Sequence, residues 1–284
     1  MIEPLQKGME LLADIQESAV PPGQWRMWWL GQSGFLIKWE ERYCLLDPYL
    51  SDSLTIKYAS TDKPHNRMTE LVLAPEMLDF IDVVSSSHNH TDHLDAETLQ
   101  PLRRVNPDLA IVIPEANRSF VAERLRCDSA WPIGLSEGSQ HEVRGFRFVG
   151  IPAAHETLEV DEFGRHRFMG YIVRFGGWTF YHSGDTLLYE GMVERLKPWS
   201  VDVALLPING RDPVRRVAGN LDGTQAARLA KDIGAGLVVP CHYDMFKFNT
   251  ASPESFVAEC NKLNQPHYVM KNGEGLDSIS LPAQ

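Results

Sequence analysis

Hydrophobic residues in this 284-residue chain gather in short runs that end at glycine, proline or polar turns. Runs of this length, rich in Val, Ile, Trp and Phe, predict β-strands. The predicted strands are Met27–Leu30, Phe35–Trp39, Tyr43–Leu46, Phe80–Ser87, Ala110–Ile113, Val143–Ile151, Gly170–Phe175, Trp178–His182, Val201–Pro207 and Leu237–Pro240. The first two flank Gly31-Gln32-Ser33-Gly34, which favours a β-hairpin turn.

Helical spacing of apolar residues characterises other segments between these runs. The predicted helices are Ala96–Val105, Asn117–Leu125, Met192–Leu196, Thr224–Ile233 and Pro253–Leu263. Residues 1–22 are expected to form an amphipathic helix packed on the domain, with an apolar face made by Leu5, Met9, Leu12 and Ile15. Its acidic polar face disfavours a membrane-surface helix. Ser51–Glu76 shows no clear periodicity and is expected to be a surface loop, of a length that is often functional.

Predicted strands and helices alternate in both halves of the chain, and no linker rich in Pro, Gly or Ser divides them. The length fits one large α/β domain. We therefore expect a single domain over residues 1–284. Its coarse architecture is a four-layer αββα sandwich, in which two sheets face each other and helices lie outside.

The formal net charge is −11. This acidity argues against general nucleic-acid binding, because phosphate backbones attract Lys and Arg. No apolar run is long enough to cross a bilayer, so no membrane partner is expected. The four cysteines match neither a zinc-finger pattern nor a redox CxxC pair. Since the N-terminus lacks an apolar signal core, we expect reduced thiols and a cytoplasmic protein.

The densest cluster of metal-capable side chains lies in residues 87–93, SHNHTDH, directly after a predicted strand. His88 and His90 are two residues apart, so in extended backbone they point the same way. If the chain then turns into a helix start, Asp92 and His93 point elsewhere and can reach a second ion. A lone histidine is more often a surface or core residue, but four such groups in six positions favour metal binding. Imidazole and carboxylate suit zinc, iron or manganese.

Three further candidates follow predicted strands later in the chain. His155 comes after Ile151–Ala154, Asp185 lies in YHSGDT, and His242 follows Val238–Cys241. Strand ends are where α/β folds gather functional groups. Each residue alone is a weak signal, but in this order after HxHxDH they extend the candidate set to seven.

This pattern resembles the metallo-β-lactamase superfamily: Asp47 at the end of an early strand, then HxHxDH, then His, Asp and His. Within it, the chain is similar to the L-ascorbate-6-phosphate lactonase group. The stretches that carry this likeness are Met27–Gly31, Tyr181–Asp185, Asp202–Leu205 and Val239–Asp244. The likeness runs from Pro22 to about Asn261, and it implies the four-layer fold of that superfamily and a metal-dependent hydrolase.

The resemblance also implies a role for each candidate residue. One divalent ion would be held by His88, His90 and His155. The other would be held by Asp92, His93 and His242. Asp185 would bridge the two ions, and Asp47 would orient ligands by hydrogen bonding. The implied cofactor is therefore a pair of divalent ions, zinc, manganese or iron.

Other polar residues near these motifs carry less specific patterns. His182 is expected to support the site by hydrogen bonding rather than to bind metal. Cys241 is expected to be a buried, inert thiol, because neighbouring strand residues point to opposite faces. Basic residues that could bind a phosphate are Lys63, His65, Arg67, Arg211, Arg215 and Arg216. For any one of them a solvated surface role is the more common one.

The expected reaction is hydrolysis by a metal-bound hydroxide, because divalent ions lower the pKa of bound water toward neutrality. Asp92 would orient the hydroxide or shuttle a proton, so Asp92 and Asp185 are the candidate catalytic residues. The ions make the pocket locally positive and favour anions. We expect an ester-like bond in a small anionic molecule, a sugar-phosphate lactone being the leading case.

Two other functions stay open. One is phosphodiester hydrolysis on the same fold, although the acidic chain disfavours a nuclease and no apolar membrane-facing segment suggests a phospholipase. The other is a catalytically silent metal-binding module. An oxidoreductase would need a flavin or a Cys-rich iron domain, and the chain offers neither. The oligomeric state, including a homo-oligomer, is not fixed by the sequence.

Overall fold

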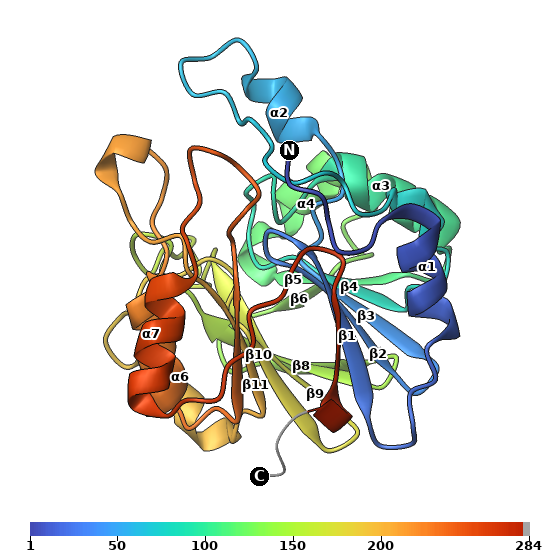
Figure 1. The fold of residues 1–284 in the computed structure, drawn as a ribbon. Coiled ribbons are helices and arrows are strands. Elements are labelled where there is room, and N and C mark those ends of the chain that lie inside the picture. The colour runs from blue at the N-terminus through green and yellow to red at the C-terminus, as the bar shows by residue number, and fades with distance from the viewer. Residues whose placement is uncertain (281–284) are drawn as a thin grey trace.

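Two β-sheets face each other in the computed structural model, which describes residues 1–280 (Figure 1). The first sheet has the order β13 (Gly275–Asp277), β1 (Trp25–Gly31), β2 (Gly34–Trp39), β3 (Arg42–Leu46), β4 (Val83–Ser85), β5 (Ala110–Pro114) and β6 (Ile133–Leu135). The second has the order β12 (Leu237–Cys241), β11 (Val203–Pro207), β10 (Trp178–His182), β9 (Met169–Phe175), β8 (Phe146–Pro152) and β7 (Gln140–Val143).

Helices cover the outer faces of both sheets. The helices within residues 1–280 are α1 (Gly8–Glu17), α2 (Ser53–Tyr58), which lies above the sheets (Figure 1), α3 (Ala96–Val105), α4 (Arg118–Leu125), α5 (Met192–Leu196), α6 (Gly223–Asp232) and α7 (Glu254–Leu263). Short 3-10 turns are η1 (Pro75–Met77), η2 (Glu115–Asn117), η3 (Lys197–Trp199), η4 (Pro213–Arg215) and η5 (Ser278–Ser280). α1, α3 and α4 pack on the first sheet, and α6 and α7 on the second (Figure 1). The expected four-layer αββα architecture is confirmed.

The sequence of strand β1 is apolar on both faces because both faces are buried. Trp25, Met27 and Trp29 pack into the core between the two sheets. Trp28 and Leu30, which alternate with them, pack into the core beneath the outer helices. A strand covered on both faces reads as a continuous apolar run, without alternation of polar and apolar residues.

The N-terminal helix packs with part of the predicted face, since Ile15 is buried and Leu12 contacts the core. Leu11 and Ile15 are fully buried, whereas Leu5 and Met9 are 51% and 70% exposed. The helix begins only at Gly8, so Leu5 lies outside it. The buried ammonium of Lys38 donates to three carbonyl oxygens at the end of the helix, including those of Gln16 (3.1 Å) and Ser18 (2.9 Å). Those carbonyls have no partner within the helix, so the lysine docks the helix on the sheet.

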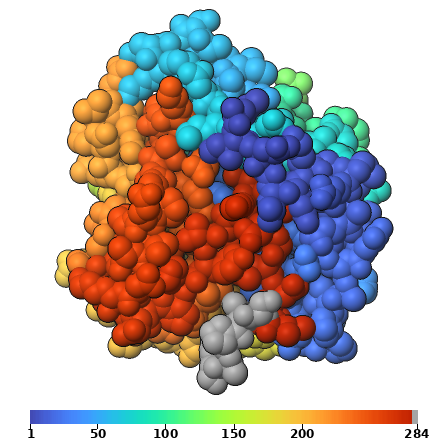
Figure 2. All heavy atoms as spheres, viewed as in Figure 1, coloured from blue at the N-terminus to red at the C-terminus, as the bar shows by residue number. Residues whose placement is uncertain are grey.

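The expected loop Ser51–Glu76 is less irregular than its sequence indicates, since it contains α2 and the start of η1. The segment after α2 adjoins the segment around η4, seen as light blue beside orange at the top of Figure 2. Lys63 Nζ donates to Val214 O at 2.6 Å, and Arg216 forms an ion pair with Asp62. Two segments distant in sequence thus meet above the sheets.

The directions of the strands bring several strand ends to one edge of the molecule. β3 and β4 are parallel, and so are β10, β11 and β12. β8 and β10 both run antiparallel to β9, so they share a direction. The loops after β4, β8, β10 and β12 carry the predicted site residues. Among residues 1–280, no helix combines the length and apolar character needed to cross a bilayer.

Candidate metal centre

Seven side chains that the sequence singled out come together in two groups at this edge. The first group is His88, His90 and His155, and the second is Asp92, His93, Asp185 and His242. In each group, one potential ligand atom per residue lies within 4.8 Å of the others. The loop after β4 supplies members of both groups, as its spacing predicted.

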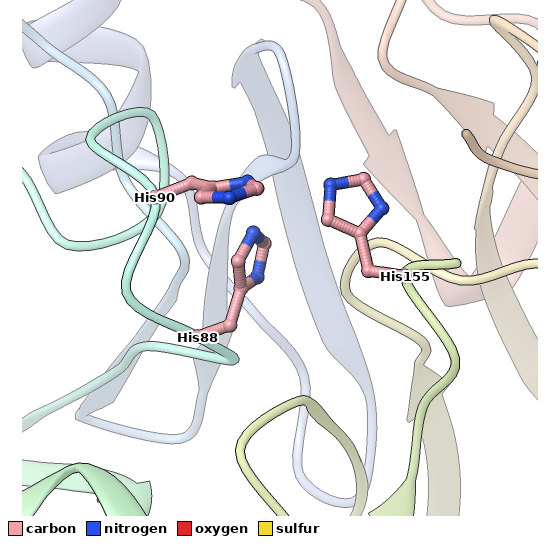
Figure 3. Close-up of side chains that lie close together, drawn as sticks. All are labelled: His88, His90 and His155. Atoms are coloured by element: carbon pink, nitrogen blue, oxygen red, sulfur yellow. The ribbon is translucent and has the colours of Figure 1, made fainter. Parts of the chain in front are cut away.

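The first group consists of three imidazoles that converge from two loops (Figure 3). The ring centroids of His88 and His90 are 4.6 Å apart, and that of His155 lies 4.9 Å from His90. His88 and His155 are buried, whereas His90 is exposed. Nδ1 of His155 lies 2.9 Å from the carbonyl oxygen of Gly219, so its Nε2 is left facing the centre.

The second group pairs two carboxylates with two imidazoles. Nε2 of His93 lies 3.3 Å from Asp185 Oδ1 and 3.7 Å from Asp92 Oδ2. Nε2 of His242 lies 3.2 Å from Asp185 Oδ2 and 3.6 Å from Asp92 Oδ2. Asp185 Oδ2 also lies 3.5 Å from Nε2 of His155, a member of the first group. The Asp185 carboxylate therefore lies between the two groups.

A buried network holds the loop that carries His88 and His93. Nδ1 of His93 donates to Asp47 Oδ2 at 2.7 Å. Asp47 also accepts from the backbone N–H of Ser87 at 3.0 Å and from the Ser87 hydroxyl. Asp47 thus contacts the loop and one imidazole, but it is not a member of either group.

His182 supports the turn that carries Asp185. Its Nε2 lies 2.9 Å from Ser33 O, and its Nδ1 accepts from the Gly184 N–H at 3.4 Å. Gly184 has a φ of +57°, and a Cβ at this position would lie 2.5 Å from the Cβ of Ser87. Glycine therefore permits the close approach of the two loops. The side chain of Cys241 is buried, and burial raises the pKa of its thiol.

Several buried atoms of the centre have no hydrogen-bond partner among residues 1–280. They are His88 Nε2, His93 Nε2, Asp185 Oδ1 and His242 Nδ1. Buried polar atoms are rarely left unpaired in folded proteins. Imidazole nitrogens and carboxylate oxygens are the ligands that zinc, iron and manganese use in proteins. The donor set and its unpaired atoms therefore fit divalent ions.

The surroundings give the histidines of the two groups opposite protonation. His90 is accessible to solvent on one side, but desolvation by the surrounding protein and the nearby His155 lower its pKa to about 4. Burial lowers the pKa of His88 well below its usual range. The imidazoles of the first group are therefore neutral. Burial also disfavours charge on His242, but the carboxylates of Asp185 and Asp92 outweigh it and raise its pKa to about 9. The same carboxylates hold the pKa of His93 above its usual range.

Four of the eleven non-glycine residues that have a positive φ within residues 1–280 lie around the centre. Gln32 (φ +50°), Asp47 (φ +41°), Glu156 (φ +101°) and His242 (φ +63°) are non-glycine residues in the positive-φ region. Such conformations cost free energy, and they persist where surrounding contacts enforce them. The four residues come from four different loops, so the strain near the centre does not arise from one irregular segment.

A cavity of about 380 Å³ adjoins both groups. This volume lies at the small end of the range for small-molecule sites. Its wall includes three cationic residues, Lys57, Arg124 and Arg216. It also includes the aromatic residues Tyr58, His65, Phe246 and Phe248. The rings of Tyr58 and His65 are stacked with centroids 4.2 Å apart, so part of the wall is flat and apolar.

Of the four arginines that the sequence suggested for substrate binding, only Arg216 lines this cavity. Arg67 is held by Asp52 (2.7 Å) and by the carbonyl oxygen of Ser51. The other two are also engaged elsewhere. Arg211 pairs with Glu156 at 2.6 Å, and Arg215 donates to the carbonyl oxygens of Asn209 and Thr250. These three side chains are therefore engaged with other groups of the chain and lie outside the wall of the cavity.

Three residues at the centre or the cavity were missed. Lys57 and Arg124 line the cavity, and the amide of Gln32 reaches Asp92. Arg124 lies in an ordinary helical segment, and no local pattern separates it from a surface arginine. The sequence did predict the hairpin turn that contains Gln32. It did not indicate that this turn lies beside the segment of His242.

Comparisons with known proteins agree with this geometry. Residues 42–243 match the family described as "Beta-lactamase superfamily domain". A UPF0173 metal-dependent hydrolase from Alkaliphilus metalliredigens is 30% identical, over 84% of this chain and 94% of the relative. A probable L-ascorbate-6-phosphate lactonase from Escherichia coli is 24% identical, over 87% of this chain and 77% of the relative.

Two solved structures show how widely this fold is used. The isothiocyanate hydrolase from Delia radicum gut bacteria superposes with a TM-score of 0.68 at 18% identity, over 88% of this chain and 98% of that one. CmlA, a diiron β-hydroxylase from Streptomyces venezuelae, gives 0.63 at 13% identity, over 92% of this chain and 55% of that one. Likenesses at this level of identity show the shared fold, and a fold by itself implies no one reaction.

The superfamily match spans most of the chain, and the curated relatives along nearly its whole length are metal-dependent hydrolases. The sequence motif, the fold and the paired His/Asp groups agree with that assignment. This chain belongs to the beta-lactamase superfamily and is a metal-dependent hydrolase of the metallo-β-lactamase fold.

Proposed function

We propose that this hydrolase uses two divalent ions to cleave an ester-like bond in a small anionic substrate, with a lactone as the leading case. The observation that carries the proposal is the place of Asp185. Its Oδ2 is 3.2 Å from His242 Nε2 and 3.5 Å from His155 Nε2. A carboxylate between two ligand groups suits a bridging position, and bound ions there would activate water and polarise the attacked oxygen.

Other side chains of the centre are placed to assist the reaction. Asp92 lines the cavity and keeps a pKa below its usual range, because burial is outweighed by the neighbouring His93 and His242. It is therefore ionised and can orient water or accept its proton. His90 and His155 border the same cavity, so a substrate there lies beside both groups.

The cavity also supports the proposed substrate class. Lys57 is exposed on α2, and Arg216, which also pairs with Asp62, lies on the segment after η4, so cationic groups border the cavity on two segments. They attract an anionic group at a distance from the scissile bond. The stacked Tyr58 and His65 offer a flat face to an apolar part or a ring. A small cyclic ester with a phosphate or carboxylate meets both requirements.

The deciding experiment combines metal analysis with a substrate panel. Protein purified without chelator should bind about two divalent ions per chain under saturating metal. It should then hydrolyse one or more anionic lactones, and Asp185→Asn should abolish that activity. One ion or fewer would reject the binuclear centre. Cleavage of phosphodiesters alone would replace the lactonase proposal by a phosphodiesterase, and two bound ions without any turnover would favour a silent metal-binding module.

A further inference from the structure

The tip of the hairpin between β1 and β2 reaches the candidate metal centre through the side chain of Gln32. Its Nε2 donates to Asp92 Oδ2 at 2.7 Å and lies 3.1 Å from His242 Nε2. The side chain is completely buried. Because an ionised carboxylate can only accept hydrogen bonds, the amide nitrogen must be the atom that faces Asp92. One amide thus contacts two of the four members of the second group.

The backbone of this turn is fixed from both sides. The carbonyl oxygen of Gln32 accepts from the His242 N–H at 2.9 Å and from the indole N–H of Trp29 at 3.0 Å. The carbonyl oxygen of Ser33 is 2.9 Å from His182 Nε2. These contacts hold Gln32 at a φ of +50°, a conformation that glycine or asparagine adopts more easily. The glutamine is strained, and its side chain is the part that reaches Asp92.

We propose that Gln32 is a positioning residue for the second ligand group, an inference that rests on the proposed metal centre. Its amide fixes one oxygen of Asp92, so the carboxylate cannot rotate freely. Hydrogen bonds to ligands commonly set their orientation in metal sites. Gln32 Oε1 is buried and has no partner within residues 1–280. The contacts of the amide with the second group are therefore made by its nitrogen alone.

Two substitutions of Gln32 test whether its hydrogen bond to Asp92 matters apart from the conformation of its backbone. Gln32→Asn keeps an amide and suits a positive φ, but it is one methylene too short to reach Asp92. Gln32→Met keeps the length and loses the donor. Glu40→Asn is the matched control, because Glu40 has a φ of +51° at the exposed turn between β2 and β3, away from the centre. Zn²⁺ affinities come from competition with a chromophoric chelator, and Co²⁺ absorption reports the ligand geometry.

Both Gln32 variants should bind one ion as wild type does and the other about 10–100-fold more weakly. The Co²⁺ spectrum of the weakened site should change, and Glu40→Asn should leave both affinities unaltered. Wild-type affinities in both Gln32 variants would overturn the inference. So would an equal loss of both ions with a lowered melting temperature, since the turn would then only support the fold. A wild-type protein that binds no ion would instead reject the metal centre itself.

Discussion

Oδ2 of Asp47 lies 2.7 Å from Nδ1 of His93, and neither side chain is exposed to solvent. Because the Nδ1 proton points to Asp47, the Nε2 atom of His93 faces Asp92 and Asp185. A carboxylate behind a histidine sets its tautomer and its orientation. Asp47, which follows β3, therefore orients a residue of the candidate metal centre without belonging to either ligand group.

Removing the charge of Asp47 should weaken metal binding. In Asp47→Asn, the amide no longer offers two acceptor oxygens to His93 and Ser87, so we expect about 10–100-fold lower metal affinity. Asp95→Asn is the control, since Asp95 is an equally buried carboxylate that accepts from Ser51 and Thr98 outside the centre. Chelator competition measures both. Equal affinities in Asp47→Asn and wild type would contradict the role of Asp47.

Metal binding should depend on pH differently at the two groups. His242, with a pKa of about 9, is protonated at pH 7 and must lose its proton to bind an ion. Affinity at the second group should therefore rise by about tenfold per pH unit for each proton released, up to about pH 9. His90, with a pKa of about 4, is already neutral above about pH 5, so the first group should show little dependence. Zinc titrations between pH 6 and 9 would reveal two slopes; a single shared slope would speak against this assignment.

Loss of one member of either group should abolish hydrolysis and spare the fold. His90 is exposed, so His90→Ala should change the free energy of unfolding by only about 0.5 kcal/mol. Asp185→Asn preserves shape and removes the charge between the groups. His141→Ala, an exposed histidine on β7, is the control and should keep full turnover. Near-normal turnover in His90→Ala or Asp185→Asn would show that the site is assigned wrongly.

The exposed cations of the cavity should govern recognition of the anionic group. Lys57→Ala and Arg216→Ala should raise KM for a phosphorylated lactone more than for its unphosphorylated form, with kcat less affected. Arg147→Ala should have no effect, because Arg147 pairs with Glu142 on the surface strands. The readout is kcat/KM for both lactones in each variant. If the phosphate made no difference to wild type, remote recognition by these residues would be ruled out.

Gly184→Ala should lower the free energy of unfolding, and a control variant can separate the two causes of this loss. Its φ of +57° and the approach to Ser87 both oppose a Cβ, and we expect a loss of about 1–3 kcal/mol. Gly138 has a similar φ of +69°, but a Cβ there would meet no atom within 4 Å. Gly138→Ala therefore measures the backbone cost alone. Chemical denaturation should show the larger loss for Gly184→Ala, and equal losses would mean that the approach to Ser87 is not restrictive.

Short sequence patterns were sufficient to predict those features that depend only on residues close together in the chain. The segment after β4 was recognisable because four metal-capable side chains lie within six positions. The structure directs them to two groups through bends and turns, and not through the extended backbone and helix start that were expected. His155, Asp185 and His242 were recognisable because each follows an apolar run that ends abruptly. The apolar runs of β1 and β2 and the turn between them were similarly plain.

Features that depend on tertiary packing were not accessible in this way. Arg67 and Arg211 form ion pairs with carboxylates that lie 15 and 55 residues away in sequence. Arg124 lines the cavity because of how α4 packs beside the loop after β4, where it donates to the carbonyl oxygen of Asn89. The buried face of α1 depends on where the helix begins, and helical spacing alone selected Met9 where the structure buries Leu11.

The seven side chains are shared between the two sheets: the loop after β4 of the first sheet carries four, and loops after β8, β10 and β12 of the second carry three. An ion held from both sides would act as a crosslink between halves of the molecule that are far apart in the chain. Its binding energy would then favour docking of one sheet on the other. A folding intermediate with only the first sheet formed would hold an incomplete set of ligands, so tight metal uptake would mark the end of assembly.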